Sequence, residues 1–220
     1  MYMKRTVFVL ALFCLATGAF ALGLSAGVGA SGAWYMTDIK TSNALASTEM
    51  LGTDIPITFL AFADITYAQL AVGFQMINGS HTTKTSTISG VTTTTDISSH
   101  ANLRYLTFAG YGKLPIKLGP IVLFPMLGVE YDLTISGTDA SGNDLTGRQK
   151  ADFNEFWFKG GVGADIPITP KIYVRPELIF GYKLLSKPEN DYVKFQKDGG
   201  NDSSILDLTF ELGVLAGLRL

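Results

Sequence analysis

The chain has 220 residues, of which 47% are hydrophobic and 16% are charged, and its formal net charge is −2. This length suffices for one sizeable domain, and the composition excludes a disordered chain. No basic patch is present that would attract DNA or RNA, so we expect no nucleic-acid partner.

The N-terminus has the three parts of a secretory signal peptide. Lys4 and Arg5 precede the apolar run TVFVLALFCLATG, and the small residues of AFA follow at positions 19–21. A single transmembrane helix is the alternative, but the run is shorter than the roughly 20 residues that cross a bilayer. We therefore predict a signal peptide over residues 1–21, cleavage after Ala21, and one domain over residues 22–220.

Apolar residues alternate with small or polar residues along most of the remaining chain. The pattern is clear in LGLSAGVGASGAWYM, AQLAVGFQMI and KIYVRPELIFGYK. Alternation over ten or more residues predicts β-strands with two different environments. Eight such runs occur, over residues 22–36, 53–63, 66–79, 101–112, 120–132, 153–164, 171–183 and 204–219.

The segments between these runs alternate between long and short. Three short segments, near Asp64 and at KLPIKLG and DIPITP, take turns with four long polar ones: TDIKTSNALASTEMLG, SHTTKTSTISGVTTTTDISSH, LTISGTDASGNDLTGRQKAD and LLSKPENDYVKFQKDGGNDS. An even number of strands with one elaborate rim and one plain rim is typical of transmembrane β-barrels.

The length of the runs separates a membrane barrel from a soluble fold. Strands of soluble sandwiches are usually about five or six residues long, whereas about 9 to 11 tilted residues cross a bilayer. We therefore predict an all-β fold, an eight-stranded antiparallel up-and-down transmembrane β-barrel. A soluble lipocalin-like barrel is the alternative.

These features resemble the small eight-stranded outer-membrane barrels of the OmpA, OmpX and OmpW kind. The resemblance rests on the signal junction, the eight runs, the unequal rims and a final strand that ends at Leu220. The residue at that position departs from the family, which typically has an aromatic residue there. It implies the outer membrane of a diderm bacterium, with outer-membrane lipid around the barrel, and we expect a monomer.

Pro125 and Pro176 each remove a ladder donor, so we expect a bulge or a shortened strand at each.

If the large apolar side chains face lipid, the same alternation sends the charged side chains inward. A cation at the middle of the lipid face would cost about 2 to 4 kcal/mol, which opposes the reverse orientation. The inward set is mixed in sign, so we predict a luminal charge network of paired groups. Its members are Glu130, Glu155, Lys159, Arg175, Glu177, Lys183, Asp207, Glu211 and Arg219. The network either fills a narrow interior or lines a proton or ion path.

The second long segment, HTTKTSTISGVTTTTDISSH, is rich in β-branched residues. A tight turn at residues 89–90 would pair Ile88 with Val91 and, in the same register, Phe74 with Tyr105. The resulting ribbon would present an edge to which a partner could add a strand. A flexible polar loop is the alternative.

We predict a non-enzymatic outer-membrane protein with a structural or adhesion-type role, whose long loops bind extracellular protein or matrix ligands. A narrow OmpW-like channel for small hydrophobic solutes is the alternative. The contexts HTT and HAN of His81 and His100 do not reproduce the H-x-S-N motif of a lipid A deacylase, which argues against an enzyme. Two histidines without a third ligand do not make a zinc site, so we expect no metal and no cofactor.

Overall fold

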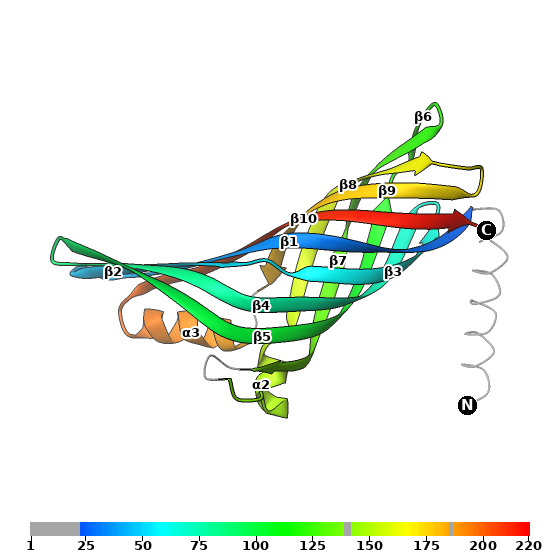
Figure 1. Cartoon of the computed structure of the whole chain (residues 1–220). Helices are drawn as coiled ribbons and strands as arrows, with labels where there is room; N and C mark the ends of the chain where they lie inside the picture. Colours follow the sequence, from blue (N-terminus) through cyan, green and yellow to red (C-terminus); the bar gives the residue numbers. More distant parts are fainter. Residues whose placement is uncertain (1–22, 139–141, 185–186) are drawn as a thin grey trace, which may run out of the picture.

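The computed structural model describes residues 23–138, 142–184 and 187–220. The predicted signal peptide, residues 1–21, lies outside the described residues. The described part folds into one β-sheet that closes on itself (Figure 1). Neither of its helices has the length and apolar character needed to cross a membrane.

Eight antiparallel strands form the barrel wall. Each pairs with its neighbours in chain order, and the last pairs with the first to close the ring. The predicted eight-stranded antiparallel up-and-down barrel is therefore confirmed, and each alternating run of the sequence overlaps one wall strand. These strands are β1 (Leu24–Ser42), β3 (Ile57–Ile65), β4 (Ala68–Ile88), β5 (Val91–Lys113), β7 (Ile121–Thr138), β8 (Glu155–Pro167), β9 (Ile172–Leu184) and β10 (Asp202–Arg219).

Two further strands lie where connections were expected. β2 (Ala46–Asp54) pairs with the end of β1, so the first long segment is a hairpin and its prediction as a loop was wrong. Its turn is held by Asn43, whose Oδ1 accepts the backbone N–H groups of Leu45 and Ala46, both at 2.9 Å. β6 (Ile116–Leu118) forms a short hairpin with β7 inside KLPIKLG.

The ends of β10, β1, β2, β4 and β5 continue beyond the barrel as one five-stranded sheet (Figure 1). We call residues 37–54, 79–101 and 202–206 the projecting sheet. Its longest hairpin turns at Ser89 and Gly90, whose φ angles of 49° and 82° are those of a type I′ turn. Ile88 pairs with Val91, as the sequence predicts.

The predicted register does not continue from this turn into the barrel. Phe74 pairs with Leu106, and the predicted pair with Tyr105 is wrong, because the register shifts by one residue between Asn78 and Ser80. Gly79, with φ 75°, lies at this bulge. The shift turns Tyr105 into the lumen, where its side chain is buried.

The register runs unchanged through both prolines, and β7 and β9 continue past them, so the prediction of a bulge or a shortened strand at each is wrong. The carbonyl of Pro125 accepts the N–H of Leu114 at 3.1 Å. In an antiparallel ladder the carbonyl and the nitrogen of one residue face the same neighbouring strand, so the nitrogen of Pro125 points to the position just past the end of β5 at Lys113. At Pro176 the β8–β9 ladder omits residues 164 and 165 and then resumes in the same register. Each missing donor is thus accommodated without an extra residue.

Two helices lie in long segments predicted as loops. α2 (Gly147–Asp152) begins with a capping box between Thr146 and Gln149. α3 (Lys187–Asp198) packs against β10 and ends at two glycines; the second, Gly200, has φ 82° and donates to the carbonyl of Lys197 at 2.9 Å. We call the end of the barrel that carries the helices and the projecting sheet the loop rim, and the end at Gly23 and Leu220 the terminal rim.

One close contact inside the wall yields a test of the packing. A Cβ at Gly217 would overlap the ring of Tyr173, which is fully buried and fixed by a 2.9 Å hydrogen bond to Ser25. Gly217→Ala should therefore cost about 1–3 kcal/mol of stability, measured by urea unfolding of the refolded protein. Gly32→Ala is the matched control, because a Cβ at Gly32 meets nothing within 4 Å, and equal losses for both variants would contradict this packing.

Candidate functional site

The outer surface of the barrel wall is a continuous apolar band. Leu127 of β7 is 72% exposed, and every other wall strand also turns apolar side chains outward. On the loop-rim side of this band, each of the eight strands contributes an outward aromatic ring. These rings belong to Trp34, Phe59, Phe74, Phe108, Tyr131, Phe158, Phe180 and Phe210.

These rings form a girdle around the wall, because strand pairing places several of them side by side. Trp34 pairs with Phe210, and Phe210 pairs in turn with Phe180, with ring centroids 5.0 Å apart. Phe108 pairs with Tyr131 on the other side of the barrel. Aromatic girdles of this kind flank the apolar band of membrane barrels.

The lumen near the terminal rim is organised around Arg175, whose side chain is completely buried. Its guanidinium lies against the rings of Phe62 and Phe124, 4.9 and 4.8 Å from their centroids. Its polar partners are Asp64, Asp165 at 2.6 Å, Gln69 at 3.0 Å and Glu177 at 3.9 Å. Lys113 adds a second cation, 2.7 Å from Asp64.

Lys159 is the centre of the middle ion cluster. Its Nζ lies 2.5 Å from Glu130 and 3.0 Å from Glu211, and the hydroxyl of Ser31 donates to Glu211 at 2.5 Å. Asp132 is fully buried, and neither of its carboxylate oxygens accepts a hydrogen bond from the described residues. This level of the lumen therefore contains more carboxyl groups than cations.

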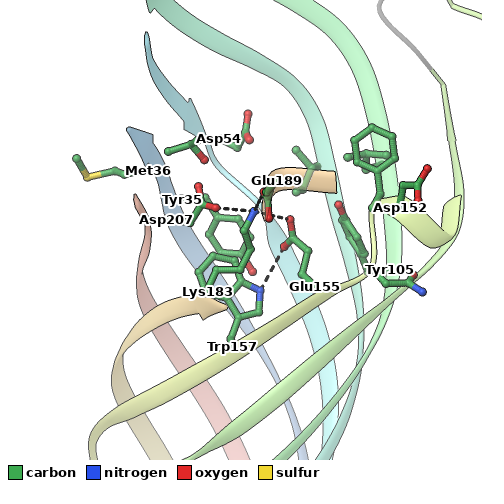
Figure 2. Close-up of a pocket in the computed structure, with 15 residues that line it drawn as sticks. Tyr35, Met36, Asp54, Tyr105, Asp152, Glu155, Trp157, Lys183, Glu189 and Asp207 are labelled. Carbon is green, nitrogen blue, oxygen red and sulfur yellow. Dashed lines mark hydrogen bonds and ion pairs between the residues drawn. The ribbon is translucent and has the colours of Figure 1, made fainter. Parts of the chain in front are cut away.

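Lys183 binds three carboxylates near the loop rim (Figure 2). Its Nζ lies 2.7 Å from Asp207, 2.8 Å from Glu189 of α3 and 3.5 Å from Glu155. The indole N–H of Trp157 donates to Glu155 at 3.2 Å. Lys183 thus ties helix α3 to the inner wall of the barrel.

Eight of the nine predicted luminal residues enter ion pairs, and they do so in these three clusters rather than in one network. The exception is Arg219, which lies at the terminal rim over the ring of Tyr173, 5.4 Å from its centroid, and forms no ion pair within the described ranges. Sequence reasoning missed Asp64, Lys113 and Asp165, which had been placed in turns. Phe62, Tyr111 and Gly163 point inward, and the next inward position of each strand lies two residues further along the chain. Extending each run by two residues would therefore have found all three charges.

Among the residues that the structure describes, the cavities at the two ends of the lumen are much larger than the one between them. A cavity of about 350 Å³ lies at the loop rim and one of about 640 Å³ at the terminal rim. The cavity between them is only about 20 Å³, which is room for about one water molecule. In the parts of the chain that the structure describes, no group of three or more His, Cys, Asp or Glu side chains is arranged to hold a metal ion.

No family model and no curated protein sequence matches this chain. The solved structures to which it is similar include Neisserial surface protein A, at 12% identity and TM-score 0.44 over 87% of this chain and 97% of that one. Outer membrane protein OprG of Pseudomonas aeruginosa aligns at 12% identity and TM-score 0.43, over 90% and 95% of the two chains. The outer membrane protease OmpT of Escherichia coli aligns at 9% identity and TM-score 0.45, over 90% and 97%.

The middle cluster allows a matched comparison of buried and exposed charge. Lys159→Met should cost about 3–5 kcal/mol, because it leaves Glu130 and Glu211 buried without their cation. Lys40 also bridges two carboxylates, at 2.9 and 3.0 Å, but its side chain is 56% exposed. Lys40→Met should therefore leave the denaturant midpoint unchanged. Similar midpoints for both variants in denaturant titrations would contradict the ion pairing inside the lumen.

Proposed function

We propose that this protein is a monomeric, non-enzymatic outer-membrane barrel that binds an extracellular protein through its projecting sheet. The proposal of membrane insertion is supported by the apolar band and its aromatic girdle, which surround all eight wall strands. A soluble barrel would expose this surface to water, where contiguous apolar patches of such extent are rare. In lipid, closure of the ring leaves no strand edge of the wall without a hydrogen-bonding partner.

The observation that carries the binding function is the edge of β5 in the projecting sheet. β7 pairs with β5 only from Asn102 onward, so residues 91–101 have β4 on one side and no second strand among the described residues on the other. An exposed strand edge of this length is a template for an added strand. A partner that supplies an extended segment fits this edge.

The lumen supports this proposal over a channel. The ion clusters centred on Arg175 and Lys159 lie between the two end cavities, and the cavity described between them is smaller than a hydrophobic solute. A solute would have to separate buried ion pairs in order to pass. The projecting sheet, by contrast, needs no rearrangement of the barrel to meet a partner.

Insertion into lipid is tested by placing a charge on the apolar band. Leu127→Arg should lower the stability of the protein in phospholipid vesicles by about 2–4 kcal/mol, because Leu127 lies between the terminal rim and the girdle. Leu51→Arg on the projecting sheet is the control and should have little effect. A soluble barrel would tolerate both changes, so equal stabilities in guanidinium titrations would refute the insertion.

Binding through the edge of β5 is tested by shortening its hairpin. Lys84 and Thr95 pair directly, so residues 85–94 can be replaced by an Asn-Gly turn. This variant should lose binding to immobilised extracellular-matrix proteins that retain the wild-type protein. A Thr92→Val, Thr94→Val control keeps the strand and should still bind, because an added strand recognises the main chain. Binding that survives the shortening would rule out residues 91–94, the outer part of the edge, as the site.

A further inference from the structure

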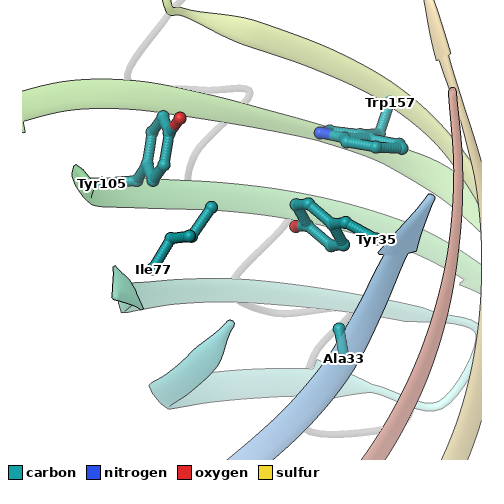
Figure 3. Packing of buried hydrophobic residues seen from close by; sticks show 5 residues of the cluster. All are labelled: Ala33, Tyr35, Ile77, Tyr105 and Trp157. Carbon is teal, nitrogen blue, oxygen red and sulfur yellow. The ribbon is translucent and has the colours of Figure 1, made fainter. Parts of the chain in front are cut away.

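The cavity at the loop rim combines aromatic rings with carboxylates (Figure 2). Its aromatic lining includes Tyr35, Tyr105 and Trp157, which belong to one buried cluster with Ala33 and Ile77 (Figure 3). The rings of Tyr35 and Trp157 are 4.9 Å apart at their centroids and are tilted by 44°. The ammonium group of Lys183 lies 6.0 Å from the centroid of the Trp157 ring, so the aromatic part of the wall already has a cation beside it.

The charge around the cavity is strongly one-sided. A single ammonium group, that of Lys183, faces five carboxyl groups: Asp54, Asp152, Glu155, Glu189 and Asp207. Lys183 contacts three of them, Glu155, Glu189 and Asp207. The cavity therefore retains negative charge that its own lysine does not neutralise.

Two of these carboxyl groups have buried oxygens without a donor. Oδ1 of Asp54 is buried, accepts no hydrogen bond and forms no ion pair with the described residues. Asp207 is 1% exposed; Lys183 approaches its Oδ2, whereas its Oδ1 has no donor in the described part of the chain. A buried carboxylate oxygen without a donor is unfavourable, and a cationic ligand in the cavity would stabilise it by opposite charge.

We propose that this cavity binds a small organic cation with an alkylated ammonium group. Ring faces attract such a cation while its alkyl groups displace water, and the carboxylates of Asp54 and Asp207 supply the opposite charge. The volume of about 350 Å³ is in the range of small-molecule sites. This site does not depend on the function proposed above, because it lies at the loop rim, between the lumen and the base of the projecting sheet, and not on the edge of β5.

Choline is a suitable probe, and its uncharged isostere 3,3-dimethylbutan-1-ol is the control for shape. The refolded full chain is kept in a maltoside detergent, because phosphocholine detergents carry the same head group as the probe. The chain has two tryptophans, so in a Trp34→Phe background the emission comes from Trp157, in the cavity wall. Choline should change this emission saturably and the alcohol should not.

Asp54→Asn is the decisive variant, because Asp54 has no cation partner that the change would leave unpaired. It should weaken choline binding about tenfold. Glu49→Gln removes the same charge from the projecting sheet and should leave binding unchanged. Asp152→Asn, on α2, is a second variant of the same cavity and should weaken binding in the same direction.

Three results of the choline titrations would overturn the proposal. These are the absence of a saturable response to choline in the folded parent, equal affinity for choline and the alcohol, and unchanged affinity in both Asp54→Asn and Asp152→Asn. A titration with calcium alone addresses an inorganic cation, and tighter binding of calcium than of choline would also overturn it. Loss of matrix binding by the shortened hairpin has no bearing on these outcomes, so the two proposals fail independently.

Discussion

The structure depends on one ladder of backbone hydrogen bonds, the pairing of β1 with β10 from Ser25–Arg219 to Ser42–Asp202. Without it the wall would be an open sheet with two unpaired edges, which lipid does not tolerate. Closing a sheet of only eight strands also fixes a narrow interior that side chains must fill. The inward charges therefore lie close enough together to pair, and each buried cation has carboxylates within about 4 Å.

Much of this arrangement could be predicted from the sequence because a β-strand has a period of two. Once the large apolar residues are assigned to the outside, the inward position of Arg175 and Lys159 follows from parity alone. The turn at Ser89 and Gly90 was also predictable, since a two-residue turn strongly favours glycine there. These features depend on local pattern and do not require knowledge of distant contacts.

The features that were missed depend on context beyond the local pattern. Two examples are the bulge at Gly79 and the unchanged register at Pro125. Both depend on where the neighbouring strands begin and end, which the sequence of one strand does not determine. β2 was missed because its polar sequence resembles a loop, and its strand character comes from pairing with β1 and β4. The grouping of the charges into three clusters likewise follows from the relative heights of strands that are far apart in the chain.

The aromatic girdle also indicates how far the projecting sheet extends from the membrane boundary. If the girdle rings lie at the membrane boundary, the stretch of β4 from Phe74 at the girdle to Ile88 at the hairpin tip is about 45 Å long, at about 3.3 Å per residue. Even with the strand tilted, the tip stands well clear of the lipid head groups. In the proposed orientation the open strand edge therefore lies away from the bilayer, so that the proposed partner need not approach the bilayer itself.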